Sequence, residues 1–411
     1  AERLAASRPN RPLFNDVSVT IADGDRLGVV GLNGSGKSTL LRMLAGELRP
    51  ETGEVRRGRG VRVGFLAQNP TLPLGTVRDA VGSGWRGEAM LDRLGMTPLM
   101  DTRTDELSGG QAKRAALAGL LVDEFEVLIL DEPTNHLDLD AIRFLEEWLA
   151  EYRGGLVLVT HDRHVLDRVT TKVLELDRGH GYLHVPTGWH AGSGYAAYLA
   201  GRAEREERAE AAEQVRKNLA TRELAWLRRG APARTSKPKA RIATATALVE
   251  GRPQAAARAG DLGLGLGSKR LGSKGIELTD VAFSWPDGTR VLDACSLTFE
   301  PGDRIGVVGA NGAGKSTLLD LVAGRLVPTA GEADRGATVR IGYYDQLGRQ
   351  LDTDQRVREA VAGDKGEPSL ADVTLMKRFW FDGDAQFAPI GTLSGGERRR
   401  LQLLLTLVPQ P

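Results

Sequence analysis

Two glycine-rich stretches of this sequence have the residue types and the spacing that bind nucleotide phosphates. GLNGSGKS covers residues 31–38, and GANGAGKS covers residues 309–316. The glycines let backbone N–H groups face phosphate oxygens, the lysine reaches the β- and γ-phosphates, and the serine hydroxyl is a ligand for Mg²⁺. One such match can arise by chance, but two in one chain predict two nucleotide sites.

The predicted phosphate-binding residues fall into two matching sets. Those of the first stretch are Gly31, Asn33, Gly34, Ser35, Gly36, Lys37, Ser38 and Thr39. Those of the second stretch are Gly309, Asn311, Gly312, Ala313, Gly314, Lys315, Ser316 and Thr317. Among them, Ser38 and Ser316 are the expected metal ligands.

A pair of carboxylates follows a short apolar run in VLILDEPTNHLDLD, residues 127–140. The run predicts a buried strand with Asp131 at its carboxyl end, where open α/β sheets bind their ligands. We expect Asp131 to hold the metal ion, usually through water, and Glu132 to polarise the attacking water. The alternative interpretation is a solvated acidic turn.

Three further polar residues follow apolar runs. LVLVTHD, residues 156–162, predicts a strand that ends at the same sheet edge, so we expect His161 to contact the γ-phosphate. A single histidine is more often structural, which is the alternative. Gln68 and Gln346 occupy matching positions in the two copies and are expected to reach the metal ion or the water, the alternative being surface glutamines.

Two serine–glycine turns precede predicted helices, LSGGQ at 107–111 and LSGGE at 393–397. Such helix starts bind anions. A single domain does not need two phosphate-binding elements, the glycine loop and the serine–glycine turn. We therefore expect each turn to contact the nucleotide held by the other half of the chain, so that ATP bridges the two halves. The residues concerned are Ser108, Gly109, Gly110, Gln111, Ser394, Gly395, Gly396 and Glu397.

The motifs recur at an offset of 278 residues, from Gly31 to Gly309, which indicates duplicated domains. Each copy begins with a short apolar run, 26–30 and 304–308, typical of a strand buried on both faces of a parallel sheet. A helix pattern follows each glycine loop. We therefore expect an α/β fold with two P-loop NTPase domains, residues 1–190 and 276–411, joined by a helical hairpin connector at 191–275.

The connector combines helix-forming and basic segments. Residues 199–229 are rich in Ala, Glu, Arg and Leu, which predicts a long exposed helix. A turn at 230–236, a second helix at about 239–249 and a flexible linker at 251–274 should follow. Basic side chains gather at this turn although the net charge of the chain is only +1, and they are Arg228, Arg229, Arg234, Lys237, Lys239 and Arg241.

We interpret this basic tip as a surface for RNA phosphates, and the alternative is a solvated basic face.

The whole chain has 411 residues, too many for one ordinary core. Its single cysteine, Cys295, excludes an internal disulfide and fits a reducing compartment. No apolar run approaches the ~20 residues of a membrane span. We expect a cytoplasmic protein without a membrane partner.

Together these motifs resemble a pair of ATP-binding cassettes of the ABC-F family over nearly the whole chain. PTNHLD after the carboxylates, the two cassettes and the basic connector carry the resemblance. WLRRGAPARTSKPKARI and LSGGERRRLQLLL are similar to Uup-like and translational-throttle members. The resemblance implies an ATPase that uses ATP and Mg²⁺, pairs its cassettes within a monomer, and binds ribosomal RNA and tRNA on the ribosome through its connector.

The resemblance also assigns residues to two composite sites. Site one would combine Lys37, Ser38, Gln68, Asp131, Glu132 and His161 with Ser394, Gly395 and Gly396. Site two would combine Lys315, Ser316 and Gln346 with Ser108, Gly109 and Gly110. Trp285 would stack on adenine, with core packing as the alternative. The second copy stops before its carboxylate strand, so we expect a truncated chain.

Three other functions share these motifs. The chain could be the nucleotide-binding subunit of a membrane transporter, a DNA-directed Uup-like ATPase, or a nucleotide-gated binding module with negligible turnover. Within the ribosomal interpretation, the sequence leaves translation regulation and ribosome protection open.

Overall fold

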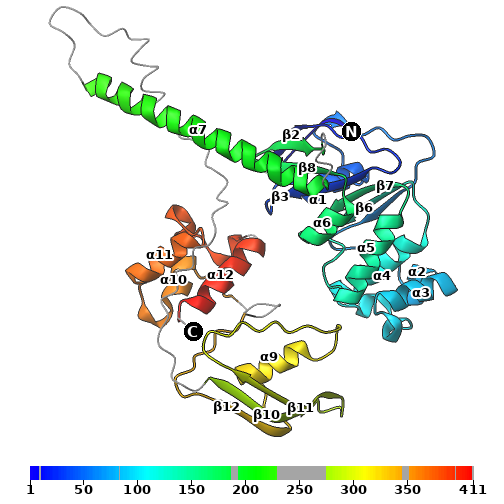
Figure 1. The fold of residues 1–411 in the computed structure, drawn as a ribbon, viewed down its shortest axis with the longest axis vertical. Coiled ribbons are helices and arrows are strands. Elements are labelled where there is room, and N and C mark those ends of the chain that lie inside the picture. Colours follow the sequence, from blue (N-terminus) through cyan, green and yellow to red (C-terminus); the bar gives the residue numbers. More distant parts are fainter. Residues whose placement is uncertain are drawn as a thin grey trace, which may run out of the picture. The chain divides into compact units, whose positions relative to one another are not determined.

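The computed structural model describes residues 1–8, 11–82, 84–186, 193–228, 275–344, 351–393 and 395–409. The chain divides into two compact units, Ala1–Arg258 and Ala259–Pro411. Figure 1 shows their helices and strands. Both units mix helices with sheets, as the predicted α/β class requires.

Unit 1 is built on a six-stranded sheet with the strand order β5-β6-β7-β3-β8-β9. All neighbouring strands are parallel except β8 and β9. The strands are β3 (Arg26–Gly31), β5 (Val63–Leu66), β6 (Val127–Asp131), β7 (Gly155–Val159), β8 (Lys172–Asp177) and β9 (His180–His184). The two apolar runs predicted around the carboxylates and His161 are therefore adjacent parallel strands.

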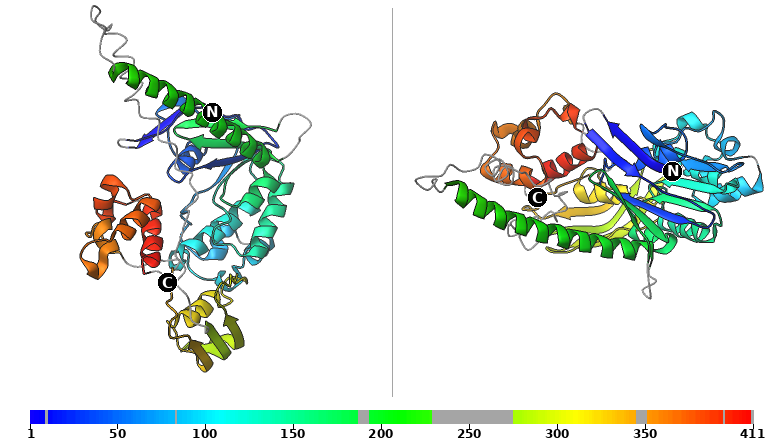
Figure 2. Two further views of the ribbon diagram at one scale, coloured as in Figure 1. Left: turned by 60° about the vertical axis from the view of Figure 1, so that its left-hand side comes forward. Right: turned by 90° about the horizontal axis from the view of Figure 1, so that it is seen from above.

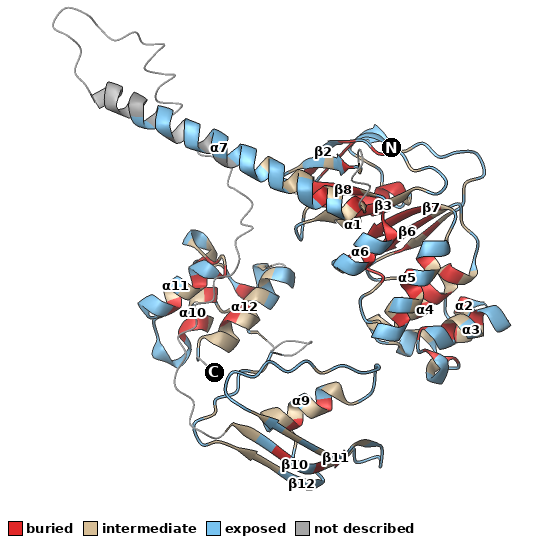
Figure 3. Ribbon diagram, viewed as in Figure 1, coloured by how far each residue is buried: buried red, intermediate tan, exposed pale blue. Residues whose placement is uncertain are grey.

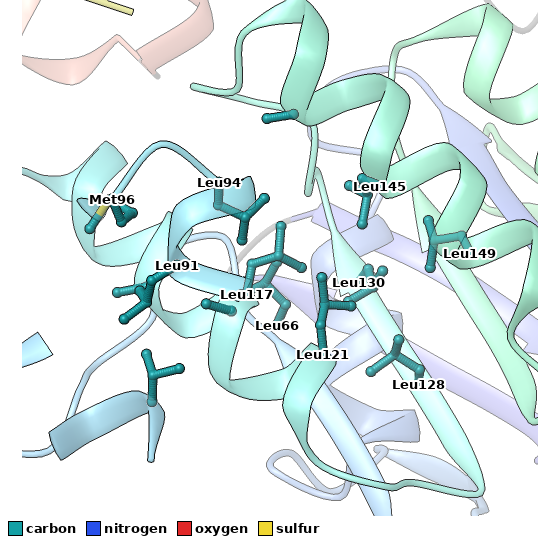
Figure 4. Packing of buried hydrophobic residues seen from close by; sticks show 14 of the residues in the cluster. Leu66, Leu91, Leu94, Met96, Leu117, Leu121, Leu128, Leu130, Leu145 and Leu149 are labelled. Carbon is teal, nitrogen blue, oxygen red and sulfur yellow. The ribbon is translucent and has the colours of Figure 1, made fainter. Parts of the chain in front are cut away.

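Side chains on the central strands alternate between two cores, because successive strand residues point to opposite faces. On β6, Leu128 and Leu130 join a core with the helices α4, α5 and α6, whereas Ile129 joins a core with α1. Figure 4 shows the first of these cores from close by. The helices of unit 1 are α1 (Lys37–Leu44), α2 (Val77–Val81), α3 (Trp85–Arg93), α4 (Gly109–Val122), α5 (Leu139–Glu151), α6 (Arg163–Val169) and α7 (Gly194–Arg228).

A small antiparallel sheet accompanies each phosphate loop, and its architecture is duplicated. In unit 1 the order is β2-β1-β4, and in unit 2 it is β11-β10-β12. Gly53 and Gly331 have φ of 80° and 78°, and a Cβ on either would lie within 2.3 Å of a backbone carbonyl oxygen. The strands are β1 (Glu2–Arg8), β2 (Arg11–Val17), β4 (Thr52–Glu54), β10 (Ile276–Ser284), β11 (Arg290–Phe299) and β12 (Ala330–Arg335).

Unit 2 departs from the prediction at residues 304–308, which we expected to form a buried strand. They form no strand, and Ile305 and Val308 are 44% and 77% exposed. In unit 1, β3 is buried because β7 and β8 lie on either side of it, and both follow the carboxylate strand in the chain. Among the described residues of unit 2, no strand pairs with 304–308. The apolar sequence alone therefore does not make this segment a strand.

The remaining helices of unit 2 surround a core of their own, which includes Val357, Met376, Phe379 and Leu401. The helices are α9 (Lys315–Ala323), α10 (Val357–Ala362), α11 (Leu370–Arg378) and α12 (Gly395–Leu407). Short 3₁₀ segments complete the described elements of both units, and they are Thr97–Leu99, Thr104–Glu106, Gly363–Lys365, Gly383–Phe387 and Ile390–Thr392.

The long helix predicted over 199–229 is confirmed as α7, which has 35 residues. It begins earlier than predicted because the Ser193 hydroxyl accepts a hydrogen bond from the Ala196 N–H and so caps the helix. At ~1.5 Å per residue α7 is about 50 Å long. Figure 2 shows it extending away from the sheet of unit 1, and Figure 3 shows that most of its described side chains are exposed.

The rest of the predicted hairpin, namely the turn at 230–236, the helix at 239–249 and the linker at 251–274, lies outside the described residues. In the parts of the chain that the structure describes, no helix combines the length and the apolar composition needed to cross a bilayer.

We predict that Leu158→Ala lowers the free energy of unfolding of unit 1 by ~2–5 kcal/mol, because Leu158 is fully buried on the central strand β7. Urea unfolding followed by circular dichroism would measure the loss. The matched control is Leu199→Ala on α7, where the leucine is 49% exposed and the change should stay within ~0.5 kcal/mol. Equal losses in both variants would contradict this account of the core.

Candidate nucleotide-binding site

The carboxyl ends of four parallel strands bring the predicted site-one residues of unit 1 to one sheet edge. The register pairs Val159 of β7 with Asp131 of β6 and with Val29 of β3, so these strands end nearly level. The loop 31–36 follows β3, Glu132 follows β6, His161 follows β7 after one residue, and Gln68 follows β5. A single sheet edge thus carries the glycine loop, both carboxylates, the histidine and the glutamine.

The glycine loop is shaped by residues that only glycine accommodates easily. Gly34 and Gly36 have φ of 80° and 101°, and a Cβ on Gly36 would lie 2.8 Å from the Phe14 ring. Gly36 precedes α1, which has no side-chain cap and no acidic residue in its first turn. Its first N–H groups are therefore left for an anion, which is the arrangement that fits a phosphate.

Lys37 bends back over this loop. Its ammonium donates hydrogen bonds to the carbonyl oxygens of Gly31 and Leu32, at 2.8 and 3.2 Å. Burial lowers the pKa of Lys37, and the carboxylates of Glu132 and Asp131 oppose that effect. Ser38 and Thr39 are half-buried in the first turn of α1, Asn33 is exposed, and the buried hydroxyl of Ser35 has no hydrogen-bond partner among the described residues.

Glu132 is held in one orientation by its backbone and by His161. Asp131 and Glu132 are only 2% and 6% exposed. The Glu132 carboxylate accepts a hydrogen bond from the His161 N–H at 3.3 Å, and its other oxygen lies 3.3 Å from Nε2 of the imidazole. Glu132 also has a left-handed φ of 54°, a conformation that costs ~1–3 kcal/mol in a residue other than glycine.

Lys113 on α4 is a second lysine near the carboxylates, and it was not predicted from the sequence. Its side chain is only 4% exposed. Burial lowers the pKa of Lys113, while Asp131 and Glu132 oppose the change. The helix pattern gave no signal for this residue, because a lysine two positions after LSGGQ is usually solvated.

The serine–glycine turn of unit 1 lies at the start of α4. Ser108 and Gln111 form a reciprocal cap, in which each side chain bonds the backbone N–H of the other. Gly110 lies against His136, since a Cβ on it would be 2.9 Å from the imidazole Cγ. Gly109 and Ser108 are exposed.

The second glycine loop repeats the geometry of the first. The Lys315 ammonium donates to the carbonyl oxygens of Gly309 and Ala310, at 2.8 and 2.6 Å. Gly314, with φ of 87°, precedes α9 as Gly36 precedes α1. Within the loop and the first turn of the helix, Asn311, Gly312, Ala313 and Ser316 are exposed and Thr317 is buried.

The remaining predicted site residues lie outside the first glycine loop and differ in their exposure. Trp285 follows β10 and is 41% exposed, with its ring edge-on to Phe283 at 5.0 Å. Gly395, Gly396 and Glu397 form the first turn of α12. Gln68 is exposed. Arg228 is the last residue of α7, whereas Gln346, Ser394, Arg229, Arg234, Lys237, Lys239 and Arg241 lie outside the described residues.

We predict that Gly36→Ala lowers nucleotide affinity at the first loop at least ~10-fold, because the added Cβ meets Phe14 and alanine resists this φ. All variants would carry Lys315→Met, which removes binding at the second loop. Titration with a fluorescent nucleotide would then measure the affinity of the first loop. Gly34→Ala is the matched control, since its φ is also positive but no atom lies within 4 Å of its Cβ. It should lose less affinity than Gly36→Ala, and an unaltered affinity in Gly36→Ala would disprove the packing argument.

Comparison with known proteins gives consistent matches in both units. The family described as ABC transporter matches residues 14–135 and 292–411. The ABC transporter ATP-binding protein YfmR of Bacillus subtilis is 39% identical, over 100% of this chain and 72% of that protein. The energy-dependent translational throttle protein EttA is 34% identical in Haemophilus influenzae, over 96% of this chain and 79% of that protein. EttA of Mycobacterium tuberculosis is 32% identical, over 99% of this chain and 80% of that protein.

Solved structures show the same fold. The archaeal ribosome recycling factor aABCE1, in its complex with the ribosomal stalk protein aP1, aligns with a TM-score of 0.63 at 21% identity, covering 99% of this chain and 76% of that chain. A structure titled RNase-L Inhibitor aligns with the same TM-score at 20% identity.

The structural matches establish the fold alone, while the sequence matches extend over both glycine loops and nearly the whole chain. The chain therefore belongs to the ABC-F family of tandem ATP-binding-cassette ATPases.

Proposed function

We propose that this ATPase acts on the ribosome, where ATP held between its two cassettes controls the binding of its connector to ribosomal RNA and tRNA. The observation that carries the proposal is the identity of 32–34% to translational throttle proteins over 96–99% of the chain. The helix α7, which ends at Arg228 where the basic tip begins, supports it. The role would be translation regulation or ribosome protection, in the cytoplasm.

The residues at the sheet edge suit ATP hydrolysis at site one. Lys37 would contact the β- and γ-phosphates, Ser38, Gln68 and Asp131 would hold Mg²⁺ with their oxygen atoms, and His161 would contact the γ-phosphate. Mg²⁺, when bound, supplies positive charge that offsets the charge of the phosphates. Glu132 would orient and polarise the attacking water, a role that needs a carboxylate aimed by its surroundings.

The contacts of Glu132 support that role. Its strained backbone and its two contacts with His161 fix where the carboxylate lies. The hydroxyls of Thr134 and Thr160 share a hydrogen bond at 3.0 Å, which ties the loops after β6 and β7 together. A general base gains most from such preorganisation, because it must already point at the water when ATP arrives.

We further propose that each serine–glycine turn completes the site of the other cassette. Within unit 1, α1 packs on β3 and β6, whereas α4 packs on α2, α3 and β5. The two helix starts therefore belong to different parts of one unit. Ser394, Gly395, Gly396 and Glu397 would then complete site one. Ser108, Gly109, Gly110 and Gln111 would complete site two with Lys315, Ser316, Gln346 and, on adenine, Trp285.

The cassettes of this monomer would be residues 1–190 and 276–411, with the connector at 191–275. Roles as a transporter subunit or as a DNA-directed ATPase are outcomes that the experiments below can reveal.

We predict that Glu132→Gln lowers kcat for ATP hydrolysis ~10²–10⁴-fold and leaves ATP binding intact, because the amide cannot accept the proton of the water. In a pull-down with ATP, this variant should retain ribosomes, and sequencing would identify the bound RNA. Glu147→Gln, an exposed position on α5, is the matched control and should hydrolyse ATP normally. Retention of membranes, or of DNA in preference to ribosomes at matched salt, would refute the ribosomal proposal.

We also predict that alanine at Arg228, Arg229, Arg234 and Lys237 weakens ribosome binding while basal ATP hydrolysis persists. Each lost phosphate contact should reduce the slope of log affinity against log salt by ~0.7–0.9. Sedimentation with ribosomes over a range of salt concentrations would measure it. Lys377→Ala/Arg378→Ala, an exposed basic pair on α11, should leave the slope unchanged. Unchanged binding of the tip variant at moderate salt would show that the tip does not contact RNA.

A further inference from the structure

A buried polar cluster, which the nucleotide chemistry does not use, fastens the base of α7 to unit 1. It joins Glu175 of β8, His184 of β9 and Arg205 of α7. Glu175 and His184 are 5% and 9% exposed. The Glu175 carboxylate forms an ion pair with Arg205, and it lies 3.2 Å from His184 Nε2. Burial lowers the pKa of His184, and the Glu175 carboxylate opposes that change.

Aromatic contacts and one glycine complete this cluster, which we call the α7 joint. The Arg205 guanidinium lies 4.2 Å from the centre of the Tyr182 ring, and His184 packs edge-on against Tyr198 at 5.5 Å. A Cβ on Gly201 would lie 2.7 Å from His184 Nδ1, so glycine lets the helix approach this closely. Ion pair, ring contacts and close packing act together over about two turns of α7.

The α7 joint lies where the helix leaves unit 1. Arg205 is half-buried, while every later residue of α7 whose side chain is described is exposed. From Arg205 to Arg228 the helix extends about 35 Å at ~1.5 Å per residue. The contacts of Arg205, Gly201 and Tyr198 with β8 and β9 therefore lie at the base of this helix.

The α7 joint also lies next to the first glycine loop. Glu175 pairs with Val30 across the parallel strands β8 and β3, and the next pair is Leu176 with Gly31. A Cβ on Gly31 would lie 2.5 Å from the Leu176 carbonyl oxygen, so the strands are in tight contact at this point. The carbonyl of Gly31 accepts the hydrogen bond from Lys37. Gly31 therefore connects Lys37 to the strand that carries Glu175.

We propose that the α7 joint couples nucleotide binding at the first glycine loop to the orientation of the connector helix. The inference rests on the proposed function, because it supplies the mechanical link between ATP and the RNA-binding tip. Close packing favours discrete rearrangements over gradual deformation, so a small shift at β8 can be amplified along α7. A rotation of about 10° at Arg205 moves Leu219, some 21 Å further along the helix, by roughly 4 Å.

The test measures the orientation of α7 in the full chain without ribosomes. Spin labels at Leu74→Cys and Leu219→Cys, in a Cys295→Ser and Glu132→Gln background, report the distance from unit 1 to the lever by pulsed electron paramagnetic resonance. Both leucines are exposed. We expect ATP with Mg²⁺ to shift the main distance by several ångströms when the α7 joint is intact, and to leave it unshifted or broadly distributed in Glu175→Gln/Arg205→Met.

That double variant removes both charges of the pair, so it leaves no buried charge without its partner. Glu204→Gln/Arg208→Met is the matched control, because it removes an exposed ion pair from the same helix and should keep the ATP-dependent shift. Nucleotide affinity should stay within ~2-fold in both variants. The proposal is overturned if ATP causes no shift with the α7 joint intact, or if the Glu175→Gln/Arg205→Met chain shifts normally.

A ribosome measurement separates the coupling from the proposed function. With the α7 joint intact, ATP should change ribosome affinity by a factor of ~5–150, the usual range of coupling between two sites. The Glu175→Gln/Arg205→Met variant should lose most of that factor. An ATP-dependent distance shift in a chain that does not bind ribosomes would support the α7 joint and refute the ribosomal proposal.

Discussion

The central constraint of this structure is the level ending of β3, β6 and β7 in one parallel sheet. Strand register fixes it, because the pairing of Val159 with both Asp131 and Val29 leaves no freedom in where the following residues emerge. The glycine loop, the carboxylates and His161 need no long-range contacts of their own to meet. Their convergence follows from backbone hydrogen bonds that are buried on both faces of the sheet.

At this edge of the sheet, the negative charge of buried carboxylates is offset by lysines. Asp131 and Glu132 are almost fully buried, and unpaired carboxylates in such surroundings are costly. Lys37 from the loop and Lys113 from α4 both interact electrostatically with these two carboxylates. Lys37 also holds carbonyl oxygens of its own loop, so an incoming phosphate would compete for a cation that is already engaged. The site is thus built for an anionic ligand that replaces existing contacts.

The elements that could be predicted from the sequence are those that depend on the pattern of contiguous residues. The glycine loops, their following helices and the strands before Asp131 and His161 could be read from spacing and apolar runs, because these elements form from contiguous residues. The strand predicted at 304–308 is wrong, because a strand there needs neighbouring strands that the described part of unit 2 does not supply. Lys113, and the bond between Glu132 and His161, needed the tertiary structure, because residues distant in sequence meet there.

The same distinction explains why α7 was predicted as a helix but its attachment was not. Helix propensity fixes that residues 194–228 are helical, whereas the direction of the helix depends on Glu175, His184 and Tyr182 from strands that end before it. A rigid helix can position the basic residues that begin at its end only if its attachment to unit 1 is equally well defined. The ion pair between Glu175 and the half-buried Arg205 serves that purpose better than apolar packing alone, because it is satisfied in only a narrow range of helix orientations. Under the proposed coupling, orientation of the helix, more than added stability, is what such a charged cluster would contribute at this point of the fold.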